Sequence, residues 1–402
     1  MNLIVQKFGG TSVADAARIE HVADIITRTY ATGNNVVAVV SAQGKFTDVL
    51  VDKANEINPK ASKREMDVLL AAGEQISIAL LAMAIEKRGL PVKSFLGWQA
   101  GFQTDSNYSN ARIRKINKER IENELAKRTI VIVAGFQGVN RYDDVTTLGR
   151  GGSDTSAVAL AAALNAKKCQ IFTDVEGVFT ADPRIVKSAV KLDSISYDEM
   201  LELASLGAQV LHNRSVEMAK RYNVDLEVLS SMENKPGTII KEEADVEKMI
   251  ISGVAKDTNI ARISILELKD QPGIAFKVFS LLAKEKINVD IILQSVGRSG
   301  TKDITFTVAK DNAERAVAIL DANKHLIGIK EVLCDTQSAK VSIVGAGMES
   351  NPGVACKLFD ALAQANINID MVSTSEIKIS VLIALKDAER AVMVIHDAFY
   401  NN

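Results

Sequence analysis

The strongest constraint on the fold is an internal duplication in the last third of the chain. Residues 271–295 align with residues 351–375 at an offset of 80, and eleven of these 25 positions are identical. The segments before them also match, since ARISI at 261–265 corresponds to AKVSI at 339–343. A repeat of this kind indicates one structural unit used twice. We expect each copy to run strand, Pro-Gly turn, helix, strand, strand, helix, strand, and the two copies to pack on each other.

The first 240 or so residues follow another pattern, in which short apolar runs alternate with longer Ala- and Leu-rich segments. The runs expected as buried strands are 3–8, 36–41, 129–136, 169–174 and 225–230. The segments expected as helices include 15–32, 64–88, 154–166 and 198–221. This alternation predicts an α/β fold, with a mainly parallel sheet covered by helices on both faces. Ligands bind such sheets at the carboxyl ends of the strands.

A polar segment at 234–248, with a Pro-Gly turn followed by charged residues, is the best candidate for a domain boundary. We therefore expect an α/β domain at residues 1–245. Two ferredoxin-like α+β units are expected at residues 262–335 and 339–402.

Composition excludes several classes of protein. The 402 residues include 48 Lys and Arg against 50 Asp and Glu, whereas a dedicated nucleic-acid binder should show a basic excess. The N-terminal MNLIVQKFGG does not resemble a signal peptide, and no apolar stretch approaches the ~20 uncharged residues of a membrane helix. Three cysteines and four histidines are scattered, which argues against disulfides and a metal centre. We expect a cytoplasmic protein that binds neither nucleic acid nor membrane.

The segment Lys7-Phe8-Gly9-Gly10-Thr11-Ser12 directly follows LIVQ of the first predicted strand. Two glycines allow the backbone to approach a ligand, their N–H groups can face an anion, and Lys7 adds a positive charge. Thr11 or Ser12 could cap the helix that follows. The segment fits neither the GxxxxGK[ST] nor the GxGxxG pattern. A tight turn with a solvated lysine is the alternative interpretation.

A second segment, residues 146–155, reads TTLGRGGSDT and precedes an Ala-rich helix. Backbone donors at a helix start, the Arg150 guanidinium and the Asp154 carboxylate could together bind a small molecule that carries both charges. The alternative is a flexible loop in which Ser153 or Asp154 caps the helix.

Two further signals are weaker on their own. Thr173 and Asp174 stand at the end of a predicted strand, where a nucleotide would lie, although the loop at 172–184 could also be only rich in turns. Glu74 is a lone carboxylate within LLAAGEQISIALLA, so if this face is buried it needs a cation. It could equally lie on an exposed face of that helix.

Taken in order, KFGGTS, SAQG, GEQIS, GFQG, TTLGRGGSDTSA and TDVEGVFTADPR resemble the signatures of the aspartate kinases of the amino-acid kinase family. The duplicated units resemble tandem ACT domains, which are amino-acid-sensing modules. The resemblance covers essentially the whole chain. It implies transfer of a phosphoryl group from MgATP to the β-carboxylate of L-aspartate, giving 4-phospho-L-aspartate. This is the first step of the aspartate pathway to lysine, threonine and methionine.

The resemblance also implies roles for individual residues. The catalytic candidates are Lys7 and Asp154, and the latter is expected to orient the substrate because a carboxylate needs no strong base to attack phosphorus. The candidates for substrate binding are Ser41, Thr47, Glu74, Arg150 and Ser153. The candidates for nucleotide binding are Lys7, Phe8, Gly9, Gly10, Thr173, Asp174, Phe179, Asp182, Arg184 and Gln209. The expected cofactor set is ATP with Mg²⁺, and no residue is expected to hold a resident metal.

One position departs from the family pattern. Many relatives carry a lysine in the motif GAKVLHP, whose charge reaches the nucleotide phosphates, whereas here the segment reads GAQVLHN with Gln209. An amide can donate a hydrogen bond but carries no charge. Another cation such as Lys7 or Arg184 must compensate, or this role is weaker in this chain.

The ACT resemblance implies feedback regulation by lysine, threonine or both, bound between the repeats. The effector-binding candidates are Asp270, Gly273, Ile274, Ala275, Gln294, Asn368, Ile369 and Ser375. Gln294 stands out because it interrupts an otherwise apolar strand. We also expect a homo-oligomer, alone or with a shorter ACT-only subunit, since some relatives start such a subunit near the position of Met249.

Two other functions stay open at this point. The chain could be another amino-acid kinase, acting on glutamate or acetylglutamate. It could also be a catalytically silent ACT sensor of amino acids, which would need none of the charged candidates above.

Overall fold

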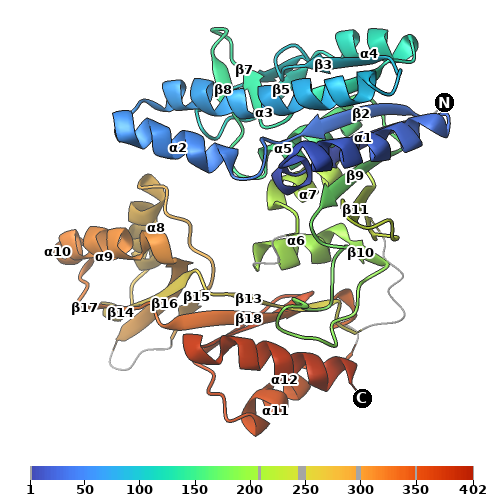
Figure 1. The fold of residues 1–402 in the computed structure, drawn as a ribbon. Helices are drawn as coiled ribbons and strands as arrows, with labels where there is room; N and C mark the ends of the chain where they lie inside the picture. Colours follow the sequence, from blue (N-terminus) through green and yellow to red (C-terminus); the bar gives the residue numbers. More distant parts are fainter. Residues whose placement is uncertain (1, 207–209, 243–249, 296–299, 349–350, 402) are drawn as a thin grey trace. The chain divides into compact units, whose positions relative to one another are not determined.

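The computed structural model describes residues 2–206, 210–242, 250–295, 300–348 and 351–401 (Figure 1). The chain forms two compact units, and the first comprises Met1–Phe179 and Val190–Lys248. The second comprises Thr180–Ala189 and Met249–Asn402. Gln209 and Met249 lie outside the described residues.

The first unit is built on an eight-stranded sheet in the order β10-β12-β11-β9-β1-β2-β6-β3. All neighbouring strands are parallel except β11 and β12, as the alternating sequence pattern predicts. The five predicted strands are confirmed as β1, β2, β6, β9 and β11. The strands are β1 (Leu3–Phe8), β2 (Asn35–Val40), β3 (Val92–Phe95), β6 (Ile130–Ala134), β9 (Lys168–Thr173), β10 (Ser194–Ser196), β11 (Leu226–Ser230) and β12 (Thr238–Lys241).

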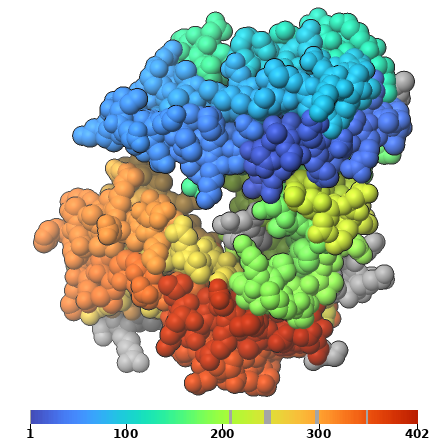
Figure 2. Space-filling model, viewed as in Figure 1, coloured from blue at the N-terminus to red at the C-terminus, as the bar shows by residue number. Residues whose placement is uncertain are grey.

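The helices of this unit are α1 (Ala16–Ala31), α2 (Phe46–Ile57), α3 (Lys63–Glu86), α4 (Glu119–Ala126), α5 (Gly152–Ala163), α6 (Tyr197–Ser205) and α7 (Asn213–Tyr222). Alternate strand residues such as Phe8, Val36 and Val40 pack with α1 and α3 in one core. Their neighbours Val37 and Val39 are buried outside that core, and α5 packs on β1, β2 and β9. In Figure 2, residues of α1 to α3 form a continuous surface of this unit.

A second, small sheet of the first unit has the order β5-β4-β7-β8. Its strands are β4 (Phe102–Thr104), β5 (Ile113–Ile116), β7 (Gln137–Val139) and β8 (Val145–Thr147). The sequence analysis did not predict this sheet, because strands of three or four residues are too short to show a hydrophobic period.

Two expectations about helices are wrong, and one alternative interpretation is excluded. The segment 198–221 is not one helix, because α6 ends at Ser205 and α7 begins at Asn213. Asp15, rather than Thr11 or Ser12, caps α1 by accepting from Arg18 N–H, since a 3₁₀ turn at Gly10–Val13 comes first. Gly151 precedes α5 in the left-handed conformation with φ 65°, so the alternative in which Ser153 or Asp154 caps this helix is excluded.

The statement that no segment could span a membrane also needs correction. Helix α3 is long and apolar enough to do so by length and composition. Its residues Ile78, Leu81 and Ile85 belong to the core beneath the main sheet. One face of this long apolar helix therefore packs in the core of the first unit.

The second unit contains the duplication as two four-stranded antiparallel sheets. The first copy consists of β14 (Ile260–Lys269), α8 (Ile274–Lys284), β15 (Ile292–Gln294), β16 (Thr301–Ala309), α9 (Ala313–Ala322), α10 (Lys324–Ile327) and β17 (Glu331–Asp335). The second consists of β18 (Ser338–Val344), α11 (Val354–Gln364), β19 (Met371–Thr374), β20 (Lys378–Ala384) and α12 (Ala388–Tyr400).

The prediction that the second copy ends in a strand is wrong. Its place beside β18 is taken by β13 (Gly253–Asp257), which comes before the first copy in the chain. The sheet orders β15-β16-β14-β17 and β19-β20-β18-β13 are therefore equivalent, although the connection to the fourth strand differs. A short segment between domains cannot be recognised as a strand of a distant repeat from sequence alone.

Two ion pairs join the copies reciprocally. Arg262 on β14 corresponds in the duplication to Lys340 on β18, and Asp290 corresponds to Asp370. Arg262 pairs with Asp370 of the other copy at 3.4 Å, and Lys340 pairs with Asp290. The Lys340 side chain is nearly inaccessible, whereas Arg262 and Asp370 are partly exposed. The duplication thus preserved a pair of charges that links its two halves.

The difference in burial predicts different contributions to stability. Asp290→Asn should destabilise the second unit by about 2 kcal/mol, because it leaves the buried Lys340 ammonium without its nearest carboxylate. The equivalent change Asp370→Asn is the matched control and should cost under about 1 kcal/mol, since that pair is partly solvated. Amide hydrogen exchange of β14 and β18 in the full-length protein measures both effects. Equal effects would contradict this assignment.

Candidate functional site

The carboxyl ends of the parallel strands bring several candidate segments to one edge of the main sheet. Lys7–Gly10 includes the last two residues of β1, and Thr173–Asp174 includes the last residue of β9. Ser41–Gly44 follows β2, and Gly135 follows β6. The parallel pairing of β9, β1, β2 and β6 fixes the order of these segments along the edge. The sheet therefore assembles residues more than 160 positions apart in the sequence.

The loop after β1 is held against the loop after β2 by close backbone packing. A Cβ atom on Gly10 would lie 2.6 Å from Ala42 O, so no larger residue fits there. Gly44 N–H donates to Gly10 O at 2.9 Å. Ser41 N–H donates to Phe8 O, and Thr47 is the second residue of α2. The close approach fixes where the Lys7 loop meets the Ser41 loop.

Two parts of the expectation for the Lys7 loop are wrong. Gly9 N–H donates to Phe172 O at 3.3 Å, so this amide is already occupied. Gly10 N–H forms no backbone hydrogen bond with the described residues. The Phe8 ring is fully buried and stacks on Phe172, with ring centroids 4.7 Å apart, so its side chain has no access to a ligand.

Lys7 meets Asp154 at this edge. The Lys7 Nζ lies 2.7 Å from the Asp154 carboxylate, and both side chains are nearly buried. Asp154 comes from the first turn of α5, where the helix dipole also favours a negative charge. The two catalytic candidates, 147 residues apart, therefore form one ion pair.

Glu74 lies on α3 and faces the loop after β2. Gly73 permits this approach, because a Cβ atom there would lie 2.7 Å from the Ala42 Cβ. The Glu74 side chain is 3% exposed, and its Oε1 accepts from Ala42 N–H at 3.0 Å. Its Oε2 has no hydrogen-bond partner in the described part of the chain. Burial raises the pKa of Glu74 to about 7, and the hydrogen bond from Ala42 N–H opposes part of this rise.

The exposed-face alternative for Glu74 is thus excluded, and the cation that a buried carboxylate requires does not come from the described residues. Glu74 forms no ion pair with them. A buried carboxylate oxygen without a partner is a suitable acceptor for an ammonium group that enters with a ligand.

Arg150 stands in a loop shaped by glycines. Gly149 has φ 79° and Gly151 has φ 65°, so both adopt conformations that favour glycine. The Arg150 side chain is exposed and forms no ion pair with any residue that the structure describes. Ser153 is buried against Gly135, where a Cβ atom would lie 2.7 Å from the Ser153 Oγ. The arrangement leaves a free guanidinium beside an ordered helix start.

The nucleotide-binding candidates divide between the two units. Thr173 O accepts from Ser231 N–H at 2.8 Å, and Asp174 is exposed at the strand end. Phe179 is partly buried and belongs to the first unit. Asp182 and Arg184 belong to the second unit, where they form an ion pair at 2.8 Å. Gln209 is outside the described residues.

The effector candidates all lie in the second unit. Gly273 begins α8 with φ 86°, and Ala275 is in its first turn, but Ile274 is buried in the core. Asp270 pairs with Lys302. All three residues of β15, including Gln294, are exposed at a sheet edge, so core packing does not require an aliphatic residue at Gln294. Asn368 and Ser375 are exposed, and Ile369 is partly buried.

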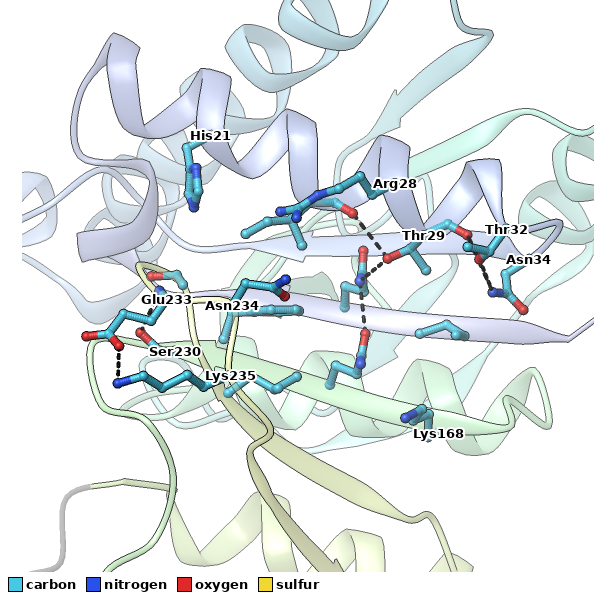
Figure 3. A pocket seen from close by; sticks show the side chains of 17 residues that line it. His21, Arg28, Thr29, Thr32, Asn34, Lys168, Ser230, Glu233, Asn234 and Lys235 are labelled. Carbon is cyan, nitrogen blue, oxygen red and sulfur yellow. Dashed lines mark hydrogen bonds and ion pairs between the residues drawn. The ribbon is translucent and has the colours of Figure 1, made fainter. Parts of the chain in front are cut away.

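A pocket of about 410 Å³ lies beside α1, and none of the candidate residues lines it (Figure 3). His21, Arg28 and Thr29 of α1 face Ser230 and Lys235, which come from the end of β11 and the segment after it. Gln6 donates to Thr29 Oγ1 and to Gln170 Oε1, whereas its own Oε1 is buried without a hydrogen-bond partner among the described residues. The lining also includes Phe172 and Ser231, which lie beside Thr173 at the carboxyl ends of β9 and β11.

Two residues that shape the site, Asp67 and Arg214, are not among the predicted ones. Asp67 on α3 is fully buried and accepts hydrogen bonds from Ser109 and Thr147. Arg214 donates to backbone carbonyls of Ala111 and Leu148. The only signal in the sequence was that Asp67 and Glu74 are seven residues apart, which is two turns on one helix face.

Comparison with known proteins identifies related chains. Residues 2–230 match the model of the amino acid kinase family, and residues 266–323 and 341–399 each match a model of the ACT domain. The chain is 52% identical to an aspartokinase of Bacillus sp. (strain MGA3), covering 99% of this chain and 97% of that relative. It is also 52% identical to aspartokinase 2 of Bacillus subtilis (strain 168), covering 99% and 98%.

Solved structures give the same relationship. The fold is similar to that of E. coli aspartokinase III in complex with aspartate and ADP, with a TM-score of 0.85, 25% identity and coverage of 99% of this chain and 100% of that chain. The same enzyme in complex with lysine and aspartate matches with a TM-score of 0.76, 26% identity and coverage of 99% of both chains.

The raised pKa of Glu74 predicts how stability depends on pH. In the folded protein Glu74 titrates near pH 7, against 4.5 as the ordinary value, so between these pH values the folded state holds a proton that the unfolded state has lost. The contribution of Glu74 to the free energy of unfolding should therefore fall by up to about 3 kcal/mol as pH rises from 4.5 to 7. Glu74→Gln should remove that fall.

Urea unfolding followed by the fluorescence of Trp98, the single tryptophan, measures this in the first unit. Glu65→Gln, an exposed carboxylate on the same helix, is the matched control and should keep the wild-type pH dependence. An unchanged pH dependence in Glu74→Gln would disprove the assignment.

Proposed function

Because the chain belongs to the amino acid kinase family and, within it, to the aspartokinases, we propose that it phosphorylates the β-carboxylate of L-aspartate with ATP. The products are 4-phospho-L-aspartate and ADP. The observation that carries the proposal is a set of charges in the first unit. A buried Glu74 oxygen and the Arg150 guanidinium have no partner among the described residues, and Lys7 pairs with Asp154. An amino acid with two carboxylates and one ammonium matches this set.

Each end of the substrate has a complementary group. The ammonium would enter the Glu74 pocket and pair with Oε2, which would make the ionised form of that carboxylate favourable. The α-carboxylate would pair with the Arg150 guanidinium, whose fork suits two oxygens. Ser41, Thr47 and Ser153 would supply neutral hydrogen bonds. These contacts leave the β-carboxylate free to face the phosphoryl group.

The reaction itself needs little beyond positioning and charge neutralisation. The β-carboxylate oxygen attacks the γ-phosphorus, the bond to the bridging oxygen breaks and its electron pair leaves with ADP. Lys7 would neutralise charge on the transferring group, and Gly10 N–H would donate to it. Asp154, held at 2.7 Å from Lys7, would orient that ammonium and the substrate rather than accept a proton.

Magnesium would arrive with the nucleotide. No group of three or more His, Cys, Asp or Glu side chains in the described ranges is arranged to hold a metal. This fits an ion bound mainly by phosphate oxygens with one or two carboxylates from the protein. Asp174, which has no cation partner among the described side chains, would be such a carboxylate. When bound, the ion supplies neutralisation of phosphate charge.

Thr173 and Phe179 of the first unit would contact the rest of the nucleotide. Asp182 accepts from Arg184 within the second unit, and nucleotide binding by these two residues stays a prediction from the family resemblance. The aspartokinase III of E. coli was solved with ADP, which supports nucleotide use here.

An ATP-dependent assay with hydroxylamine tests the function directly, since the acyl phosphate is trapped as a hydroxamate. Aspartate should give the product, whereas glutamate and acetylglutamate should not. Preferred turnover of glutamate or acetylglutamate would favour the other amino-acid kinases. No turnover of any of the three, with amino-acid binding retained, would favour the silent sensor.

Substitutions should separate catalysis from substrate binding. Lys7→Ala should lower kcat by roughly 100-fold or more with a small change in the KM of aspartate, because its charge acts on the transferring group. Arg150→Ala and Glu74→Gln should each raise that KM, since a lost charge-assisted contact costs about 2–4 kcal/mol. Steady-state kinetics measures both. Unchanged kcat in Lys7→Ala, or wild-type KM in the other two, would refute these roles.

The second unit would regulate the first in response to lysine, threonine or both. The two ACT matches and the complex of E. coli aspartokinase III with lysine support this. Backbone N–H groups at the start of α8, which Gly273 opens, could receive an α-carboxylate. The exposed edge strand β15 would also suit pairing between chains, in a cytoplasmic homo-oligomer alone or with a shorter ACT-only subunit.

Effector binding can be measured by calorimetry with lysine and threonine, singly and combined. We expect at least one of them to bind the wild type and to inhibit it, with a coupling of roughly 5–150-fold in activity. Gln294→Ala should weaken that binding, because Gln294 is exposed and free to contact a ligand. No binding of either amino acid to the full-length protein would refute the proposal.

A further inference from the structure

Two backbone segments near Arg150 are bonded by both a buried carboxylate and a guanidinium. The segments are 109–111 and 147–148, and they also bond to each other through Ala111 N–H and Thr147 O at 2.9 Å. Asp67 takes the N–H groups of these segments, and Arg214 takes their carbonyl groups. Arg150 follows the second segment by two residues.

Asp67 acts as the acceptor in this arrangement. It is fully buried and carries no ion pair within the described chain. Thr147 donates to it from N–H at 2.9 Å and from Oγ1 at 2.8 Å. Ser109 N–H lies 2.9 Å from Asp67 Oδ2, and Ser109 Oγ also donates. Four donors from two loops therefore compensate the buried charge.

Arg214 acts as the donor. Its guanidinium lies 2.9 Å from Leu148 O and 2.8 Å from Ala111 O. It forms no ion pair with the described residues, and its pKa is lowered by burial first and by the nearby charge of Arg112 second. A cation that is held only by two carbonyl groups fixes the positions of those carbonyls closely.

The loops between these two contacts are conformationally demanding. Ser109 has φ 67°, which is unfavourable for a residue with a side chain. Gly149 packs so closely that a Cβ atom would lie 3.0 Å from Ser109 O. Such a geometry persists only when surrounding contacts hold it, and Asp67 and Arg214 provide them.

Helix α3 gives this arrangement a consequence for the ligand. Asp67 and Glu74 are two turns apart on one rigid helix. Glu74 faces the site directly, whereas Asp67 bonds the strand end that leads to Arg150. The separation between the Glu74 carboxylate and the Arg150 guanidinium is therefore set through α3.

We propose that Asp67 and Arg214 are positioning residues that fix Arg150 relative to Glu74 and so define which amino acid fits between them. The inference rests on the proposed function, because it takes Arg150 and Glu74 as the groups that bind the two charged ends of aspartate. Neither positioning residue contacts the substrate.

A double-mutant cycle tests this in the full-length enzyme. Asp67→Asn presents an amide N–H₂ to N–H donors and should raise the KM of aspartate by roughly 10-fold or more, with the KM of ATP unchanged. In an Arg150→Ala background the same change should alter the KM of aspartate by less than about twofold, because the group that it positions is gone. Equal effects in both backgrounds would overturn the proposal.

Three further variants complete the design. Asp144→Asn removes a carboxylate from the same region, which accepts from Tyr108 and Arg64 side chains, and it should leave the KM of aspartate unchanged. Arg214→Lys keeps the charge but loses the fork, and should raise that KM as Asp67→Asn does. If Asp67→Asn does not fold, Thr147→Val takes its place in the cycle, since it removes only the donor at Oγ1.

The possible results distinguish a wrong proposed function from wrong roles for Asp67 and Arg214. Wild-type enzyme without turnover of aspartate would refute the proposed function and this inference together. Active wild type, with no coupling between position 150 and positions 67, 147 or 214, would refute the inference alone. A KM effect of Asp144→Asn as large as that of Asp67→Asn would also overturn it, because the effect would then be general to this sheet.

Discussion

The site depends on helix α3, which carries two buried carboxylates without a partner cation from the described residues. Asp67 accepts hydrogen bonds from Ser109 and Thr147, which compensate for its burial. Glu74 accepts from a single backbone N–H, and its other oxygen has no partner among the described residues. The two cases show opposite uses of a buried charge. A fully satisfied carboxylate fixes structure, whereas an incompletely satisfied one retains the capacity to bind. Because one helix holds both, the binding group and the structural group keep a constant separation.

The edge of the main sheet contributes the remaining charges, and close glycine contacts make that possible. Gly10 and Gly73 each approach Ala42 or its backbone to a distance that excludes any larger residue. Gly135 does the same at Ser153. These contacts bring the loops after β1, β2 and β6 close to α3 and α5. The Lys7–Asp154 pair then forms between elements that are far apart in the sequence.

The segment Thr180–Ala189 belongs to the second unit, although it lies between two stretches of the first unit in the sequence. It follows Phe179 directly but packs in the second unit, where Ala181 and Val186 join the core of the second repeat. Thr180 Oγ1 lies 2.9 Å from His396 Nε2 on α12, and burial lowers the pKa of that histidine. Two of the proposed nucleotide-binding residues, Asp182 and Arg184, are therefore held by the unit that carries the repeats.

The sequence by itself determined the large elements and the family. Apolar strands β1, β2, β6, β9 and β11 are long enough to show their pattern, and the duplication is visible as repeated residues. Lys7, Glu74, Arg150 and Asp154 were identified because charged residues stand out beside glycines or within apolar helices. Only the tertiary structure decided which of these groups are paired. Lys7 meets Asp154, Glu74 keeps a free oxygen, β13 completes the second repeat, and Asp67 and Arg214 hold the Arg150 loop. Such contacts join residues about 40 to 150 positions apart. A single sequence carries no record of them, because burial and hydrogen bonding arise only when distant strands and helices come together.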